Sequence, residues 1–314
     1  MKQDLVQGIF DMHVHCRPDN APRKTDDIEL AKAAAEVGMG GFVLKAHQGS
    51  TVERAYLVQQ TVPNIRVFGG LVLNYLVGGL NANAVDFYVR LGAKEVWMPS
   101  LSSDYMISYM KANVSPEDRA AFNKAHGGSS SKPHETSSRE YPWPWARSGR
   151  GISLFDEKGK LVQEVWDILE ILAASEAILS TSHLSIPETF ALTEAAQELG
   201  VKRILVTHPE YMAAMSTEDQ VLLARKGVFF ERCFVLTTEA TKHIGGFLPF
   251  ETIVKNIRAV GIESTVLGTD FGQATNKHPV AAMSDYVTQL HSAGFSENEI
   301  ELMGVKTPSS LLNI

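Results

Sequence analysis

Short apolar segments rich in β-branched residues alternate with helical segments along the whole chain of 314 residues. The strand segments are Gly8–Val14, Gly41–Lys45, Arg66–Leu73, Glu95–Met98, Ala177–Thr181, Arg203–Thr207, Val228–Phe234 and Thr265–Thr269. The helical segments between them include Asp26–Val37, Thr51–Thr61, Ala82–Leu91, Lys160–Ala174, Ile186–Leu199, Ser216–Ala224 and Pro249–Val260. Eight strands alternating with helices indicate an α/β protein with a (β/α)8 TIM barrel. An open doubly wound sheet is the alternative, but no glycine-rich phosphate loop follows the first strand.

One interval in this pattern is too long for a single helix. Between Met98 and Ala177, the segment Ser115–Arg150 is polar, rich in Gly, Ser and Pro, and contains Trp143 and Trp145. We therefore predict one barrel domain over residues 1–314, with an insertion over 113–160 after strand four. The insertion would be a lid, a subunit contact or a disordered loop, and Gly151–Lys160 would form a small hairpin at its end.

Composition excludes several classes of protein. The net charge is −7, with both signs mixed along the chain, which argues against a nucleic-acid partner. Cys16 and Cys233 cannot build a disulfide framework, the first residues lack the apolar core of a signal peptide, and no apolar run is long enough to span a membrane. We expect a cytoplasmic protein with a small-molecule substrate and no membrane partner. A homo-oligomer is possible on this evidence, because the sequence does not reveal the oligomeric state.

Residues suited to metal binding follow several of the predicted strands. His13 and His15 alternate on the first strand and so project from one face. The other strand ends carry Lys45 and His47 (second strand), His183 (fifth), His208 (sixth) and Asp270 (eighth). In a barrel, side chains at the C-terminal strand ends converge on one pocket, and a catalytic cation uses about three N or O ligands plus water. The sequence thus predicts a metal site there.

Roles follow from the chemistry of each side chain. His13, His15 and His183 suit metal ligands, Asp270 suits a ligand that is also the general base, and His208 suits a ligand or an oxyanion donor. Each also has a structural alternative: His208 precedes Pro209 and could shape a turn, and His47 could lie in a solvated loop. We expect Cys16 and Cys233 to be packed in the core.

These strand ends resemble the amidohydrolase superfamily. The pattern of HxH on strand one, His on strands five and six, and Asp on strand eight is similar to that of its metal-dependent hydrolases. The segments that carry it are DMHVHCRPD, VLKAHQGS, STSHLS, VTHPEYM and LGTDFG, which resemble an uncharacterised branch. The resemblance implies a (β/α)8 barrel, one or two divalent metals, and hydrolysis of an amide, ester or lactone bond. It places His13, His15, His183, His208 and Asp270 in the metal and proton-transfer roles.

The sequence departs from the two-metal pattern on strand four. Two-metal members carry a bridging lysine carbamate or Glu at the end of this strand, whereas here it ends Val96-Trp97-Met98-Pro99-Ser100, and Lys94 lies at the opposite end. We therefore expect one ion rather than two, zinc before manganese, iron or cobalt. Lys45 is an unusual residue for such a pocket, and we expect it to be carbamylated, to hold a substrate carboxylate or to be ion-paired at the rim.

Other functions are weighed against the hydrolase. A metal-dependent decarboxylase could use the same scaffold, with Lys45 and Arg17 holding a carboxylate. A phosphoesterase that begins with HxH would normally end in Asp-x-His, whereas Phe271 and Gly272 follow Asp270. A serine esterase or lipase would need Gly-x-Ser-x-Gly, which is absent from the chain, so any esterase activity would use the metal. A barrel that only binds ligands is disfavoured because convergent buried polar groups are costly. Pocket walls are expected from loops that include Leu101–Tyr109 and Thr237–Phe250.

Overall fold

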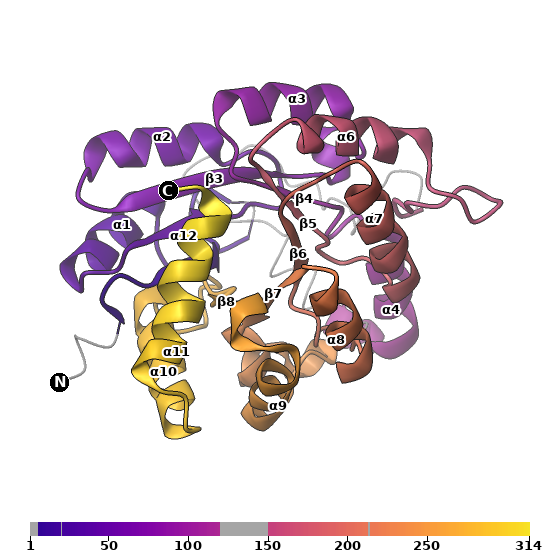
Figure 1. Ribbon diagram of the computed structural model, residues 1–314. Helices are drawn as coiled ribbons and strands as arrows, with labels where there is room; N and C mark the ends of the chain where they lie inside the picture. Colours follow the sequence, from indigo (N-terminus) through magenta and orange to yellow (C-terminus); the bar gives the residue numbers. More distant parts are fainter. Residues whose placement is uncertain (1–5, 20, 120–149, 213) are drawn as a thin grey trace.

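The computed structural model describes residues 6–19, 21–119, 150–212 and 214–314. Eight parallel strands pair in the order β1 to β8, and helices surround them (Figure 1). The strands are β1 (Phe10–Val14), β2 (Gly41–Leu44), β3 (Arg66–Val72), β4 (Glu95–Trp97), β5 (Ile178–Ser180), β6 (Ile204–Thr207), β7 (Phe229–Cys233) and β8 (Thr265–Gly268). This confirms the predicted (β/α)8 barrel, and each strand is only one or two residues shorter than expected.

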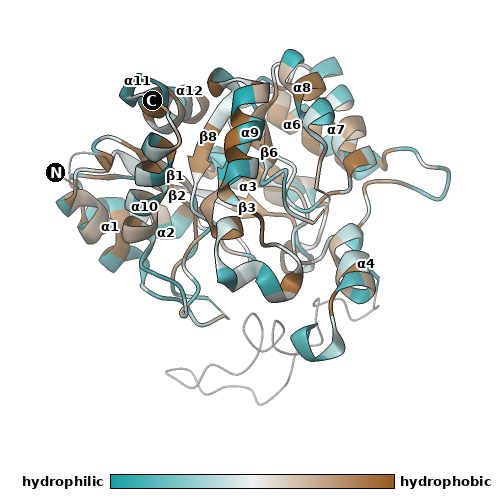
Figure 2. Cartoon of the chain, turned by 90° about the horizontal axis from the view of Figure 1, so that it is seen from below, coloured by the Kyte–Doolittle hydropathy of each residue, from teal (hydrophilic) through white to brown (hydrophobic). Residues whose placement is uncertain are grey.

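The helices form the outer layer of the barrel. They are α1 (Asp27–Glu36), α2 (Val52–Thr61), α3 (Ala82–Leu91), α4 (Asp104–Asn113), α6 (Gln163–Ala173), α7 (Ile186–Glu198), α8 (Thr217–Arg225), α9 (Phe250–Val260), α10 (Pro279–Ser292), α11 (Glu297–Glu301) and α12 (Thr307–Leu312). Short helical turns lie at η2 (Tyr75–Val77), η3 (Phe234–Thr237), η4 (Glu239–Ile244), η5 (Ile262–Ser264) and η6 (Leu302–Lys306). Apolar residues mark the strands and the inner helix faces (Figure 2).

Two segments that were predicted to be loops are partly helical, so the prediction was wrong in part. Within Leu101–Tyr109, α4 begins at Asp104, because the Ser103 side chain caps it by accepting the Met106 N–H. Within Thr237–Phe250, the short turn η4 replaces irregular backbone. The helices α10 to α12, after the last strand, were not among the expected helices.

The core has one layer outside the strands and one inside. Inside the barrel, Phe10, Val43 and Trp97 are fully buried, and Leu311 and Leu312 of α12 pack against this cluster at its base. The Lys94 ammonium donates to the Leu312 carbonyl at 2.7 Å, so Lys94 lies at this base and away from the predicted site.

The barrel closes between β1 and β8 through a buried carboxylate. Asp11 accepts hydrogen bonds from the Thr269 N–H at 2.8 Å and the Thr269 hydroxyl at 2.5 Å, and from the His13 N–H at 3.2 Å. Burial raises the pKa of Asp11 to about 7, against the lowering effect of the hydrogen bonds from Thr269 and His13. Backbone bonds continue the closure: Asp270 N–H donates to the His13 carbonyl at 2.7 Å.

The end of the predicted insertion forms a small antiparallel bridge. Phe155 lies opposite Leu161, and the Asp156 N–H donates to the Lys160 carbonyl at 2.8 Å across a tight turn. The aromatic cluster with Trp143 and Trp145 lies outside the described residues. The insertion over 113–160 and its role as a lid or subunit contact stay a prediction.

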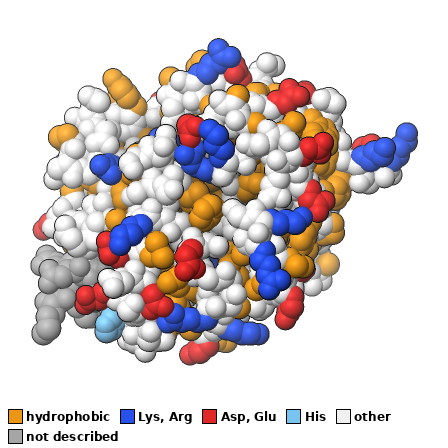
Figure 3. Space-filling view, viewed as in Figure 1, with side chains coloured by type: hydrophobic (Ala, Val, Ile, Leu, Met, Phe, Trp, Pro, Cys, Tyr) orange, Lys and Arg blue, Asp and Glu red, His pale blue; other side chains and the backbone are white. Residues whose placement is uncertain are grey.

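The surface carries both signs of charge. On the face shown in Figure 3, acidic and basic side chains are interspersed rather than gathered by sign. Exposed ion pairs such as Lys202–Glu176 at 3.0 Å contribute to this mixture. No helix in the described part of the chain is long and apolar enough to cross a membrane.

Gly70 tests the packing inside the barrel. A Cβ at this position would lie 2.2 Å from the Glu95 carbonyl oxygen and 2.6 Å from the Trp97 ring. We expect Gly70→Ala to lower the free energy of unfolding by about 3 kcal/mol, because the strand and the ring cannot both move away. Gly159→Ala is the control: its φ of +74° is strained, but its Cβ meets nothing within 4 Å, so about 1 kcal/mol is expected. Denaturant unfolding measures both, and equal losses would contradict the packing.

Candidate metal centre

His13, His15 and Asp270 bring three ligand atoms together where the barrel closes. The Asp270 Oδ1 lies 3.4 Å from the His13 Nε2 and 3.1 Å from the His15 Nε2. Both histidine side chains are buried, whereas the Asp270 side chain is 19% exposed. Three ligands at bonds of about 2.0–2.1 Å around a tetrahedral ion would lie about 3.3 Å apart, so this spacing fits a coordination shell.

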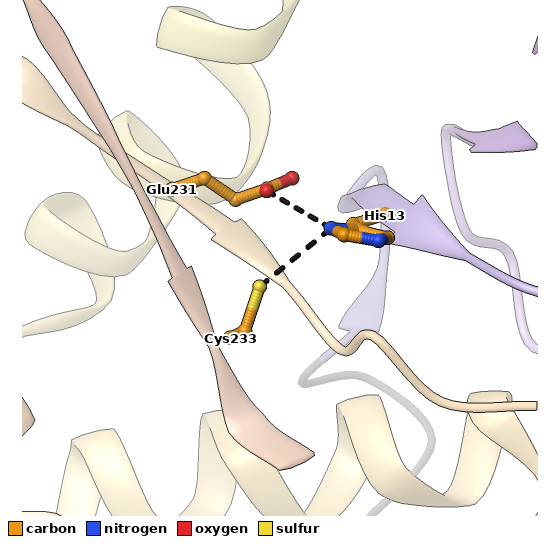
Figure 4. A group of neighbouring side chains, drawn as sticks. All are labelled: His13, Glu231 and Cys233. Carbon is orange, nitrogen blue, oxygen red and sulfur yellow. Dashed lines mark hydrogen bonds and ion pairs between the residues drawn. The ribbon is translucent and has the colours of Figure 1, made fainter. Parts of the chain in front are cut away.

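A hydrogen bond from behind fixes the orientation of His13. Its Nδ1 lies 3.0 Å from the Glu231 Oε2, and Figure 4 shows this carboxylate and the Cys233 thiol facing the same nitrogen. Burial, with Lys45 adding to it, lowers the pKa of His13 to about 3, so the ring is neutral near pH 7. A neutral ring that donates from Nδ1 to Glu231 presents a lone pair at Nε2.

The other nitrogen of the His13 ring faces Asp270. The His13 Nε2 lies 3.4 Å from the Asp270 Oδ1 and has no hydrogen-bond partner among the described residues. Burial raises the pKa of Asp270, but positive charge at the positions of the His13 and His15 rings lowers it well below its usual range. In the tautomer that donates from Nδ1 to Glu231, the His13 Nε2 and the Asp270 carboxylate are both acceptors, and a cation between them satisfies both. The donor set therefore fits a divalent cation.

The remaining predicted residues lie around this group rather than within it. His183 and His208 line the same cavity, and their ring centroids lie 5.0 Å apart. Among the described residues, neither belongs to a compact set of three ligand atoms, whereas His13, His15 and Asp270 do. Burial lowers the pKa of His208 to about 3, so it is a neutral imidazole beside the group.

Lys45 and His47 also enter the cavity. His47 is buried rather than solvated, and its ring stacks on that of His15 with centroids 4.9 Å apart. Its Nδ1 lies 3.0 Å from the Ser100 hydroxyl. Lys45 is 2% exposed and lines the cavity.

Strained backbone marks three strand ends around the cavity. Ser182, His208 and Asp270 have φ values of 51°, 32° and 53°, in the left-handed region that side chains rarely adopt. Such strain persists only where the surrounding structure enforces it, and it concentrates at functional sites. Here it turns the chain at the ends of β5, β6 and β8, next to or at residues of the predicted site.

A second compact group shares His13. The His13 Nδ1, Glu231 and Cys233 also lie close enough to hold an ion. Burial raises the pKa of the Cys233 thiol well above its ordinary value, which disfavours the thiolate that a metal needs. In the tautomer that donates from the His13 Nδ1 to Glu231, this nitrogen carries a hydrogen and offers no lone pair to an ion. The group of His13, His15 and Asp270, which borders the cavity, is the better candidate.

Sequence reasoning missed the buried acids around the site. Asp11 and Glu231 lie within strands rather than at their C-terminal ends. Glu95 is the first residue of β4 and accepts a hydrogen bond from the Ser180 hydroxyl inside the barrel. Cys233 is buried as expected, but its sulfur lies 3.7 Å from the His13 Nδ1. The available signal was an acid in an apolar strand, as in Phe229-Phe230-Glu231.

An open cavity lies in front of these residues. Its empty space, which includes open solvent, is about 660 Å³. Its polar lining is His13, His15, Arg23, Lys45, His47, His183, His208, Thr241, Asp270 and Gln273. Its apolar lining includes Leu101, Met106, Val235, Leu236 and Ile244, with Tyr211 beside the histidines.

Comparison with known proteins agrees with this architecture. The model of a family of unknown function, DUF6282, matches residues 8–231, so the chain belongs to that family. No curated protein matches the sequence. The fold is similar to that of an amidohydrolase from Pseudomonas aeruginosa, with a TM-score of 0.60 and 10% identity over 99% of this chain and 97% of that chain.

Two further solved structures share the fold. The probable dipeptidase PvdM from Pseudomonas aeruginosa has a TM-score of 0.60 and 12% identity, over 99% of this chain and 96% of that chain. A 2,6-dihydroxybenzoate decarboxylase has a TM-score of 0.56 and 9% identity, over 98% of this chain and 100% of that chain. The expected resemblance to the amidohydrolase superfamily is thus confirmed at the level of the fold.

Glu231→Gln tests the orientation of His13. The amide keeps the shape of the side chain but no longer offers a carboxylate to Nδ1–H, so metal affinity should fall about 10–100-fold. Glu95→Gln is the matched control, because Glu95 is equally buried in the barrel but contacts Ser180 instead of a histidine. Zinc titration by calorimetry measures both variants. Equal affinities of Glu231→Gln and wild type would contradict the role.

Acid should destabilise the metal-free protein. His13, His15 and His208 have a pKa of about 3 in the fold, below the ordinary value of 6.5, because of burial. Between these values the unfolded chain binds protons that the folded chain does not, so stability is lost as pH falls below about 6.5. Urea unfolding at several pH values measures this slope, which should be shallower in His208→Gln. His291→Gln, which alters an exposed histidine of α10, should keep the wild-type slope. Asp11, whose raised pKa has the opposite effect, is present in all three proteins, so the comparison of slopes isolates the histidine. Equal slopes in wild type and His208→Gln would contradict the burial of a neutral His208.

Proposed function

We propose that this chain is a metal-dependent hydrolase that cleaves an amide, ester or lactone bond of a small molecule. One observation carries the proposal: ligand atoms of His13, His15 and Asp270 lie close together at the edge of a cavity, with the His13 Nε2 unpartnered among the described residues and 3.4 Å from the Asp270 carboxylate. That arrangement is suited to a cation, and a cation beside an open cavity is suited to hydrolysis. The barrel shared with hydrolases of the same fold supports the proposal.

His13, His15 and Asp270 would hold the ion. His183 and His208 line the same cavity beside this group. When bound, the cation would lower the pKa of a water and polarise the substrate carbonyl. We propose a single zinc ion, because the neutral imidazoles and one carboxylate are ligands that zinc accepts. We also propose a cytoplasmic location, in keeping with two buried free cysteines.

Asp270 would transfer the proton of the attacking water. Asp270 is the only member of the ligand group with part of its side chain exposed to the cavity, at 19%. Its carboxylate can accept a proton from the attacking water and deliver it to the leaving group. His208, which is buried and lines the same cavity, can donate to the oxygen that develops negative charge.

Metal removal tests the function. A chelator should abolish hydrolysis of a panel of esters, lactones and amides, and zinc should restore it. Asp270→Asn should lower kcat by about 10³-fold or more because a general base and a ligand are both altered, whereas Asp285→Asn, on the surface of α10, should retain wild-type kcat. Elemental analysis of the same samples gives the metal content. Activity that survives complete metal removal would contradict the proposal, and carbon dioxide release without hydrolysis would indicate a decarboxylase.

A further inference from the structure

Lys45 is a buried lysine whose side-chain nitrogen lacks a hydrogen-bond partner among the described residues. The residue follows β2 and is 2% exposed, and its Nζ has no hydrogen-bond partner among the described residues. The Nζ lies 5.3 Å from the centroid of the Trp97 ring, which contributes a weak cation–π contact but accepts no conventional hydrogen bond. A buried ammonium without an acceptor is costly, so this site is suited to receive one.

Three acids act electrostatically on Lys45, but none forms an ion pair with it among the described residues. Asp270 contacts the His13 and His15 rings. Glu231 contacts the His13 ring and Glu95 accepts the Ser180 hydroxyl, each through one carboxylate oxygen. Arg23 offers a contrast within the same cavity lining: its guanidinium is paired with Asp19 at 2.8 Å. Of these two buried cations, Arg23 has a direct counter-ion and Lys45 does not.

The lining of the cavity that Lys45 enters is partly polar and partly apolar. The candidate metal group and Lys45 belong to the polar lining, and the apolar lining includes Leu101, Met106, Val235, Leu236 and Ile244. An occupant that satisfies both kinds of lining has an anionic group and a small apolar body. A carboxylate offers acceptor oxygens for the three N–H bonds of an ammonium.

We propose that Lys45 binds the carboxylate of a small, partly apolar organic acid, so that the substrates are amides, esters or lactones that carry a carboxylate. The identity of the cleaved bond rests on the proposed function, whereas the carboxylate site does not. Lys45 is in this account a binding residue that places the scissile bond beside His13, His15 and Asp270.

Calorimetric titration with benzoate and with benzamide tests the site. Benzamide has nearly the same shape but no charge, so wild type should bind benzoate more tightly. Lys45→Met should weaken benzoate binding by about 10–100-fold, as expected for loss of a charged hydrogen bond, and leave benzamide binding unchanged. Lys45→Gln gives the same test should the Met variant fail to fold. Lys242→Met is the matched control, because Lys242 is 64% exposed and paired with Glu239 near cavity residues Thr241 and Ile244.

Each titration is made on metal-depleted and zinc-loaded protein. The proposal is supported if both Lys45 variants lose benzoate affinity while Lys242→Met keeps it with and without zinc. Wild-type benzoate affinity in the Lys45 variants would overturn it, because the carboxylate would then bind the ion or Arg23. A carbamate on Lys45, seen by intact-mass measurement and bicarbonate-dependent zinc binding, would also overturn it. The protein could bind benzoate through Lys45 but neither retain zinc nor hydrolyse esters. That result would support the carboxylate site and contradict the proposed hydrolase function.

Discussion

Closure of the barrel between β1 and β8 is the constraint on which the site depends. Asp11 holds the two strands together by accepting both polar hydrogens of Thr269 and the His13 N–H. His13 lies in β1, His15 directly follows it, and Asp270 follows β8. Closing the barrel therefore also sets the distances between ligand atoms, so stability and the metal site share one set of hydrogen bonds.

Below the site, the barrel interior holds more polar groups than a purely structural core would. Lys45 and Glu231 each have a buried side-chain atom without a partner among the described residues, and so does Glu95. Each such atom costs about 1–3 kcal/mol when nothing satisfies it. A packed apolar interior would avoid this cost, as Phe10 and Val43 do at the barrel base. A cation and an anionic ligand above would offset much of it.

The fold and the outline of the site could be predicted from the sequence because both follow periodic rules. Strand–helix alternation indicates a barrel, and barrel geometry gathers strand-end residues such as His13 and Asp270. Glu231 was not predicted because the direction of an acid within an apolar strand depends on the register of the closed barrel. The burial of His47 was likewise unpredictable, since it depends on the distant Ser100 and on stacking with His15.

X-ray absorption spectroscopy of the zinc-loaded protein tests the central claim most directly. The account predicts a shell of nitrogen and oxygen only, with outer scattering from the His13 and His15 imidazoles and none from sulfur. A zinc–sulfur distance of about 2.3 Å would place the ion at Cys233 and contradict the account. Failure of the protein to retain any zinc or other divalent ion would contradict it equally.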